Sequence, residues 1–332
     1  MRSTIYSKFG GPEVLHPAEV PTPVPGDNDI LVRVRATPVS SGDLMARRFD
    51  QITPREFGMP LLMWLPARLY FGLRKPRIQV LGSEFAGEVA AVGSAVTRFK
   101  VGDSLMAYRG QAMGAYAELV CMPEDGIVVR KPEPLSYEQA ACVPYGGMMA
   151  LNMLQKVALR PSQRILINGA SGGIGSGAVQ LAKHHFGAHV TGVCGTPRLD
   201  YVRALGADVA IDYTREDFTR NGERYDVIFD VLGKSSFATC RSSLTDRGIY
   251  LLANFKLPQL LRGLWTSVVG GQRVVCALAP EGREDLETIR ELAEGGKFTA
   301  VVDRTFALDE AAAAHAYVES GRARGKVVLT VG

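Results

Sequence analysis

The chain has 332 residues, of which 46% are hydrophobic and 22% are charged, a composition typical of globular proteins and not of disordered or fibrous ones. The 38 Lys and Arg residues exceed the 34 Asp and Glu residues by four, and this small, scattered excess argues against a nucleic-acid partner. We expect no membrane span, because no apolar run reaches the ~18 residues that a membrane helix needs, and no secretory signal. Five widely spaced cysteines without a Cys-x-x-Cys pair predict a reducing, cytoplasmic compartment.

The first third of the chain predicts β-strands. Apolar and polar residues alternate over 30–37 and again over 85–91, which is typical of strands with one buried face. A third candidate strand covers 115–122, and glycines at turn positions separate these segments. Strands at this spacing indicate a small barrel-like domain.

From Arg164 onward, apolar strands alternate with connections long enough to hold helices. The six candidate strands cover residues 164–167, 189–193, 208–211, 227–230, 249–252 and 273–276. This alternation predicts an α/β fold with a doubly wound parallel sheet of six strands. The tail adds a predicted helix over 284–294, a strand over 300–302, a helix over 309–320 and a closing strand over 327–330.

A glycine-rich turn directly follows the first of these six strands. Its residues are Ala170, Ser171, Gly172, Gly173, Ile174 and Gly175, and a helix follows. Gly172 would let the backbone approach a pyrophosphate, Gly175 would let the helix pack closely on the strand, and the positive end of the helix would face the phosphates. We therefore predict a dinucleotide-binding turn. A tight turn without a ligand is the alternative.

The end of the second of the six strands indicates which dinucleotide binds. A site for NAD places an acidic residue there, on the ribose 2′-OH, but here the strand runs into Gly195, Thr196 and Arg198 without an acid. Thr196 and Arg198 are candidate donors to a 2′-phosphate, whose geometry a guanidinium suits, and Tyr213 is a further candidate contact. NADPH is therefore the predicted cofactor. A solvated charge at a helix start is the alternative role for Arg198.

Motifs spread over nearly the whole chain resemble the medium-chain dehydrogenase/reductase superfamily, and most of all its zinc-free quinone oxidoreductase branch, which includes the zeta-crystallin-like NADPH:quinone reductases. The motifs are Gly82-Ser83-Glu84-Phe85-Ala86-Gly87-Glu88-Val89, Gly114-Ala115-Tyr116-Ala117-Glu118, the glycine-rich turn, Leu205-Gly206-Ala207-Asp208 and Gly325-Lys326-Val327-Val328-Leu329. The resemblance implies a GroES-like β-barrel catalytic domain built from residues 1–124 and 299–332 and a Rossmann NADPH-binding domain built from 125–298. It also implies a cleft between these domains and homodimers formed through the Rossmann-domain edges.

The resemblance identifies the residues of this chain that stand at the zinc-ligand positions of the superfamily. Zinc-dependent members of the superfamily hold a catalytic ion at positions that here are Ser40, Ser83 and Cys142. Serine hydroxyls are poor zinc ligands, and one thiolate cannot replace three protein ligands. The four-cysteine zinc lobe of those relatives is also missing between Phe99 and Tyr116. We therefore predict that the chain holds no metal ion.

A bound nicotinamide supplies a hydride, and the protein supplies position and electrostatics. Without a metal ion to activate an alcohol, reduction of an electron-poor acceptor is the easier reaction, so we predict hydride transfer to a hydrophobic small molecule of the quinone type. Reduction of an activated C=C bond in an enone, 2-alkenal or enoyl substrate is the alternative within enzymes. A non-catalytic NADPH-binding protein is the alternative outside them.

Candidate catalytic residues lie in the predicted GroES-like domain and on the segment that enters the predicted Rossmann domain. Tyr145 is a candidate donor to a substrate carbonyl or a wall of the pocket. By the resemblance, Ser40 stands where related quinone reductases often carry an Asn, and Asp43 matches the Asp of their Asn-Pro-x-Asp segment. A helix cap is the alternative role for Asp43. Lys326 is a candidate contact of the cofactor, with a solvated charge as the alternative.

The segment 57–77 is rich in large apolar residues, among them Trp64. It predicts an apolar lid over a flat hydrophobic acceptor, with Trp64 as a substrate contact. An ordinary core helix and a membrane-surface patch are the alternatives. A second apolar stretch over 257–269, with Trp265, is predicted to line the same pocket or to form a dimer contact.

Overall fold

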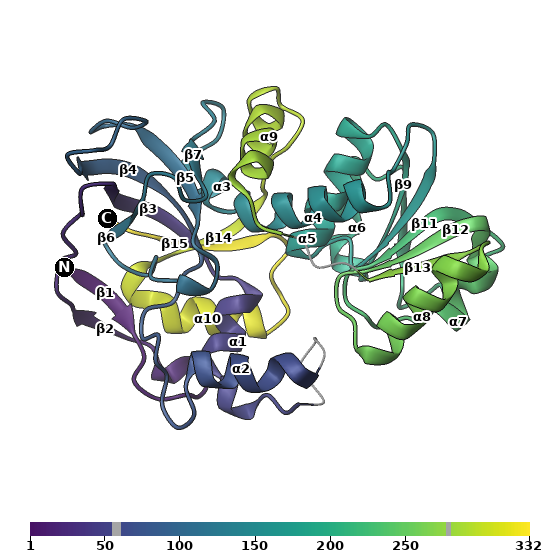
Figure 1. The fold of residues 1–332 in the computed structure, drawn as a ribbon, viewed down its shortest axis with the longest axis horizontal. Helices are drawn as coiled ribbons and strands as arrows, with labels where there is room; N and C mark the ends of the chain where they lie inside the picture. Colours follow the sequence, from purple (N-terminus) through teal and green to yellow (C-terminus); the bar gives the residue numbers. More distant parts are fainter. Residues whose placement is uncertain (55–60, 277–279) are drawn as a thin grey trace. The chain divides into compact units, whose positions relative to one another are not determined.

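The computed structural model describes residues 1–54, 61–276 and 280–332. Within them the chain forms two compact units (Figure 1). The first comprises Met1–Thr53, Leu65–Tyr145 and Gly282–Gly332, and the second comprises Pro54–Trp64 and Gly146–Glu281. From the sequence we assign residues 125–145 and 282–298 to the Rossmann domain, whereas in the structure they lie in the first unit. They do so because β7 (Val128–Arg130) pairs with β5 (Ser104–Tyr108), and α9 (Arg283–Glu294) packs against β7.

The first unit is built around a mainly antiparallel sheet, the GroES-like part of the fold. Over the described residues, the strands follow the order β14 (Val302–Ala307), β15 (Lys326–Thr330), β3 (Asp29–Pro38), β4 (Glu84–Val92), β5 and β7, and β6 (Leu119–Pro123) also pairs with β3. A separate antiparallel pair joins β1 (Arg2–Ile5) and β2 (His16–Glu19). The alternation predicted for the longest strand is confirmed, since Ile30, Val32 and Val34 of β3 are fully buried while Arg33 between them is exposed.

Two apolar clusters hold the first unit together. One contains Val32, Phe85 and Leu105, and the other contains Leu81, Tyr116 and Leu329. The α-helices of this unit are α1 (Ser41–Arg47), the larger part of α2 (Leu61–Phe71), α3 (Tyr137–Ala141), α9 and α10 (Ala311–Glu319). Short 3-10 helices cover Pro12–Val14, Phe49–Gln51, Gly110–Ala112 and Leu308–Glu310.

The tail of the chain differs in part from its prediction. The helix α9 and the closing strand β15 are confirmed. The strand expected over 300–302 is instead β14, which runs over Val302–Ala307 and pairs in parallel with β15. Three of its six residues, Asp303, Arg304 and Thr305, are polar or charged, and none of the six is fully buried, so an apolar pattern could not reveal it.

The second unit contains the predicted six-stranded parallel sheet. Its order is β10 (Val209–Asp212), β9 (His189–Cys194), β8 (Arg164–Asn168), β11 (Tyr225–Asp230), β12 (Leu244–Leu252) and β13 (Arg273–Cys276). Every pairing is parallel, and the order is the doubly wound Rossmann order, in which ligands bind beyond the carboxyl ends of the strands where the order reverses. The β12 strand begins earlier than the predicted 249, because Leu244 pairs with Tyr225.

Helices connect the strands of the second unit. They are α4 (Pro144–Lys156), which enters the unit at Gly146, α5 (Gly173–Gln180), a π-helical turn over Leu181–His185, α6 (Leu199–Ala204), α7 (Phe237–Cys240) and α8 (Leu257–Val269), with 3-10 helices at Thr196–Arg198 and Arg241–Ser243. Leu166, Val193, Ile228 and Tyr250 form the centre of the apolar core. No helix in the described part of the chain has the length and hydrophobicity to cross a membrane.

Candidate functional site

The glycine-rich turn joins β8 to α5, as the sequence predicts. Gly169 has a φ of +93°, a conformation that only glycine adopts easily. The backbone N–H groups of Gly169 and Ala170 both donate to the carbonyl oxygen of Val193 on the neighbouring strand, at 3.1 and 3.0 Å. A Cβ atom on Gly175 would overlap the carbonyl oxygen of Gly169. Glycine at both positions therefore lets α5 begin close against the end of β8.

The start of α5 offers unused hydrogen-bond donors. Gly172 is the N-cap residue and no side chain caps the helix. The first N–H groups of a helix have no acceptor within it, so those of Gly173 and Ile174 point out of its positive end. A Cβ atom on Gly172 would come no closer than 3.4 Å to any described atom. The turn is thus an open cradle of donors that fits a pyrophosphate; Ala170 is buried beneath it and Ser171 is half-buried.

The end of β9 carries the three residues predicted near a 2′-phosphate. Thr196 and Arg198 lie in the 3-10 helix after the strand, and the exposed Tyr213 ring lies against Gly195. The Thr196 hydroxyl donates to Oδ2 of Asp212 at 2.5 Å. In this arrangement its proton is directed at that carboxylate.

Asp212 is a functional candidate that the sequence reasoning missed. It ends β10 and pairs with Cys194 at the tip of β9, so an acid does stand beside this tip, supplied by the neighbouring strand. Its Oδ1 accepts bonds from the Thr214 amide and hydroxyl at 3.0 and 2.8 Å. Hydrogen bonds from Thr196 and Thr214 hold the pKa of Asp212 below its usual range. A carboxylate here can accept from a ribose hydroxyl.

In the first unit, Ser40 and Asp43 form the capping box of α1. Ser40 is the N-cap residue; its amide donates to Oδ2 of Asp43 at 2.8 Å, and its Oγ accepts from the Asp43 amide at 3.2 Å. The Ser40 hydroxyl also lies 2.7 Å from Oδ2 of Asp43, which it donates to. Oδ1 of Asp43 accepts from the Gly82 amide at 2.8 Å. These contacts join α1 to the loop before β4, which is the capping role that the sequence left open for Asp43.

A chain of buried polar side chains leads away from Asp43. Tyr116 donates to Asp43, and its phenol oxygen lies 3.0 Å from Nε2 of His315. Nδ1 of His315 lies 3.1 Å from a guanidinium nitrogen of Arg47, which in turn contacts Glu319 at 2.5 Å. Burial raises the pKa of the Asp43 carboxyl, and its hydrogen bonds oppose this. Burial, and then the Arg47 charge, lower the pKa of His315 to about 3, so this ring is neutral.

Glu84, at the start of β4, is a second buried acid near candidate residues. Its Oε2 accepts from the Tyr145 amide at 2.8 Å, and its Oε1 is buried with no hydrogen-bond partner among the described residues. Burial raises the pKa of Glu84 to about 6, and the charge of Lys326, at the start of β15, opposes this. Lys326 therefore lies near Glu84, and the structure brings Glu84, Tyr145 and Lys326 together at one end of the barrel strands.

The predicted catalytic and substrate residues have different surroundings. Tyr145 is half-buried, and its ring stacks on that of Tyr108 with 5.7 Å between the ring centres. Trp64 lies on α2 and is half-buried. Residues 57–60 of the predicted lid segment lie outside the described residues. On α2 itself, Leu62 and Leu65 are 87% and 55% exposed, so an ordinary core helix is the wrong interpretation of this segment.

The side chains at the zinc-ligand positions of relatives do not suit zinc. Ser40 is engaged in the capping box, and burial raises the pKa of the Cys142 thiol to about 12, which keeps it protonated, whereas zinc binds thiolates. Within residues 1–54, 61–276 and 280–332, no three His, Cys, Asp or Glu side chains gather where they could hold a metal ion. The residues present therefore do not fit a catalytic zinc.

Comparisons with known proteins agree with this architecture. The family model described as "Alcohol dehydrogenase GroES-like domain" matches residues 26–133, and the model described as "Zinc-binding dehydrogenase" matches residues 205–329. The description "Zinc-binding dehydrogenase" contrasts with the side chains that this chain carries at the zinc-ligand positions, which do not suit zinc.

Full-length relatives are also found. The chain is 31% identical to a quinone oxidoreductase of Pseudomonas aeruginosa, with 98% of each chain covered. It is 29% identical to a 2-methylene-furan-3-one reductase of Solanum lycopersicum, with 99% of this chain and 79% of that protein covered. Among solved structures, the Escherichia coli quinone oxidoreductase complexed with NADPH is similar at a TM-score of 0.78 and 25% identity, with 99% of this chain and 100% of that chain covered.

Proposed function

We propose that this chain, which belongs to the quinone oxidoreductase branch of the medium-chain dehydrogenase/reductase superfamily, transfers a hydride from NADPH to a quinone-type acceptor without the help of a metal ion. The observation that carries the proposal is the open cradle of amide donors at Gly173–Gly175, directly after the first strand of a doubly wound sheet. The relatives support an NAD(P)H-dependent oxidoreductase, and the proposal adds the cofactor, the acceptor class and the residues.

The second unit supplies the proposed cofactor residues. The amides of Gly173, Ile174 and Gly175 would hold the pyrophosphate, with Ala170, Ser171 and Gly172, whose amide donates to the Gly169 carbonyl, shaping the turn. Arg198 would bind the 2′-phosphate as a two-pronged donor, and Thr196 and Tyr213 would lie beside it. When bound, NADPH supplies the hydride. Asp212 favours a ribose hydroxyl over a phosphate, so the preference for NADPH rests on Arg198.

The first unit supplies the proposed acceptor-side residues. We assign Tyr145 as the donor to the acceptor's oxygen, held in place by the bond from its amide to Glu84 and by stacking on Tyr108. Asp43 fixes Ser40, and Lys326 is proposed to contact the cofactor. The exposed apolar side chains of α2 favour a flat hydrophobic acceptor, with Trp64, at the end of the segment 54–64 that belongs to the second unit, as a proposed contact.

The absence of a metal from the proposed mechanism follows from the donor set. Two serines and a protonated thiol at the relatives' ligand positions cannot supply the three protein ligands of a catalytic zinc. A quinone accepts a hydride without such an ion because its ring delocalises the negative charge. Position and a single hydrogen-bond donor then supply most of the catalysis.

The alternative acceptor is an activated C=C bond, which the similarity to a furanone reductase favours. The test is a steady-state assay of purified protein, in which loss of reduced nicotinamide is followed with a naphthoquinone or an acyclic enone and with NADPH or NADH. Faster turnover of the quinone with NADPH supports the proposal, and faster turnover of the enone supports the alternative. Tight NADPH binding without turnover of either acceptor would favour a non-catalytic protein.

We also propose a homodimer formed through the second unit. Within the described residues, β13 is an edge strand of the parallel sheet, and α8 beside it exposes Leu261, Trp265 and Val268 by 57%, 63% and 86%. An unpaired strand edge next to an exposed apolar face is typical of an interface. Light scattering on the purified chain checks the mass, and a monomer would contradict the dimer.

A further inference from the structure

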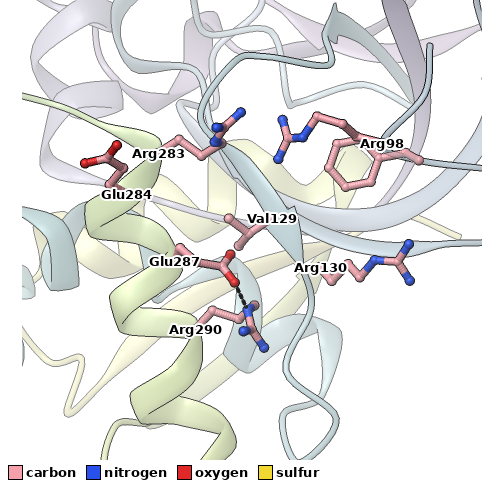
Figure 2. Close-up of a pocket in the computed structure, with 8 residues that line it drawn as sticks. Arg98, Val129, Arg130, Arg283, Glu284, Glu287 and Arg290 are labelled. Carbon is pink, nitrogen blue, oxygen red and sulfur yellow. Dashed lines mark hydrogen bonds and ion pairs between the residues drawn. The ribbon is translucent and has the colours of Figure 1, made fainter.

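A hollow of about 510 Å³ lies on the first unit, apart from every residue assigned to the proposed reaction. Its walls come from the segment before β5, from β7 and from the first turns of α9 (Figure 2). Four arginines line it, namely Arg98, Arg130, Arg283 and Arg290, together with two carboxylates and the apolar side chains of Phe99 and Val129. This is a volume in the range of small-molecule sites.

Two of the four arginines are balanced by carboxylates. Arg290 bonds Glu287 at 2.7 Å, and Arg130 bonds Asp103 at 3.1 Å. Glu287 pairs most closely with Arg290, and its charge also attracts Arg98. Glu284, the other lining carboxylate, points away from Arg98 in Figure 2.

Arg98 and Arg283 are the two lining arginines that form no ion pair among the described residues, although the charges of Glu124, Glu287 and Asp125 act on Arg98. Their guanidinium groups point toward one another across the top of the hollow, above Val129 (Figure 2). Arg98 donates to the backbone carbonyl of Glu124 and lies over the Phe99 ring, 5.0 Å from its centre. Arg283 forms no ion pair in the described part of the chain. No carboxylate bridges the two guanidinium groups.

This arrangement is electrostatically unfavourable when the hollow is empty. Burial, and then the charge of Arg283, lower the pKa of Arg98. Arg283 is also the first residue of α9, a twelve-residue helix with Glu284 and Asp285 in its first turn, which offset a cation at the positive end of the helix. An anion between the two guanidinium groups would relieve the repulsion between them.

We propose that this hollow is a binding site for a phosphate group of a small phosphorylated molecule, held between Arg98 and Arg283. Guanidinium groups match the geometry of phosphate oxygens with two parallel N–H donors. Because the remaining volume far exceeds a phosphate, the ligand carries further atoms along Phe99 and Val129. The site is independent of the dinucleotide turn, whose residues all belong to the second unit.

The test is calorimetric titration of the full chain, saturated with NADPH so that the glycine-rich turn is occupied, with inorganic pyrophosphate and with inorganic phosphate, at constant ionic strength set with chloride. The double variant Arg98→Gln, Arg283→Gln removes both charges from exposed side chains, so it is expected to fold. Arg198→Gln removes the arginine proposed for the cofactor's 2′-phosphate, and Arg220→Gln, at a side chain that is 87% exposed, is the control for loss of one positive charge.

The proposal predicts that the double variant binds pyrophosphate at least about tenfold more weakly than the wild type, since two charge-assisted bonds are lost, while Arg198→Gln and Arg220→Gln keep the affinity of this site. Unchanged NADPH oxidation by the double variant would show that its fold and its proposed active site are intact. Equal affinity in the double variant, loss of all binding in Arg198→Gln alone, or no binding by the wild type would each overturn the proposal. A failure of quinone reduction in every protein would leave this site unaffected.

Discussion

The phenol oxygen of Tyr116 lies 3.0 Å from Nε2 of His315, and both side chains are fully buried. Because Tyr116 donates its proton to Asp43, it must accept from His315, which fixes the imidazole proton on Nε2 and leaves Nδ1 to accept from Arg47. The two neutral side chains thus link the charge of Arg47 to that of Asp43. In Figure 1, α1 and α10, which carry Arg47 and His315, lie side by side although these residues are 268 positions apart.

Replacement of Tyr116 by Phe tests this link. The change leaves the Nε2 proton of His315 buried without an acceptor and takes one donor from Asp43, so we expect a loss of roughly 2–3 kcal/mol in the free energy of unfolding. The matched control is Tyr70→Phe, whose exposed hydroxyl donates only to the Gln111 carbonyl and whose loss should cost less than about 1 kcal/mol. Urea denaturation of both variants measures the difference, and equal losses would refute the link.

The buried His315 should make stability depend on pH. Its pKa in the folded chain is lowered to about 3, below the roughly 6.5 of an unfolded chain. As the pH falls, the unfolded state therefore binds the proton before the folded state does. The contribution of the neutral His315 to the free energy of unfolding is fully present above about pH 6.5 and is lost as the pH falls from there toward 3. Between about pH 7 and pH 5 we expect a loss of about 2 kcal/mol that is absent from His315→Gln.

His16→Gln is the control for this pH experiment, since His16 is exposed. Unfolding free energies at both pH values should fall by the same amount in His16→Gln and in the wild type. If His315→Gln also followed the wild type, the neutral, buried state of His315 would be disproved.

Glu84→Gln should stabilise the chain at neutral and higher pH. The folded-state pKa of Glu84 is raised to about 6 by burial, so the contribution of this residue is favourable below the unfolded value of about 4.3 and is lost as the pH rises through 6. At about pH 8 the variant should gain about 2 kcal/mol, because an amide oxygen can still accept from the Tyr145 amide and no charge is buried.

Glu88→Gln is expected to change the free energy of unfolding at neutral and higher pH in the opposite direction to Glu84→Gln. Hydrogen bonds from Arg35 and Tyr137 lower the pKa of Glu88, so its ionised form contributes stability above the unfolded pKa and the variant should be less stable than the wild type at about pH 8. Denaturation midpoints of both variants at about pH 8 and about pH 4 check the two signs. A destabilised Glu84→Gln at the higher pH would contradict the buried, unpaired carboxylate.

Gly172→Ala separates cofactor binding from folding. Gly172 has a φ of −78°, which alanine adopts, and the new Cβ would come no closer than 3.4 Å to another atom, so stability should change little. The methyl group would occupy the cradle, and we expect NADPH to bind at least about tenfold more weakly, because the backbone could no longer approach the pyrophosphate. Fluorescence titration with NADPH measures this. Gly295→Ala, with φ −79° and a nearest atom at 3.5 Å, is the control, and equal affinity in the two variants would remove the turn from the cofactor site.

Local patterns in the sequence predicted the local features of this fold. The six parallel strands, the glycine-rich turn and the alternation of β3 follow from periodicity and from glycine positions, because each depends on residues close together in the chain. The strand β14 was misplaced because Arg304 and Thr305 are exposed and hide its apolar side.

Long-range contacts account for what the sequence could not reveal. The bond between Thr196 and Asp212 depends on the pairing of β9 with β10, and the contact of His315 with Arg47 depends on the packing of α10 on α1. Each joins residues whose spacing in the chain follows no motif. For the same reason, the sequence around His315 does not predict its contacts with Tyr116 and Arg47, and the sequence around Arg283 does not predict that it faces Arg98.

We propose that hydride transfer from NADPH by this protein needs no metal ion. The direct measurement is NADPH oxidation by a naphthoquinone before and after treatment of the protein with a zinc chelator, with the metal content of the same samples determined by mass spectrometry. The account predicts an unchanged rate at a zinc content far below one ion per chain. A rate that disappears with the zinc and returns when Zn²⁺ is added back would contradict it.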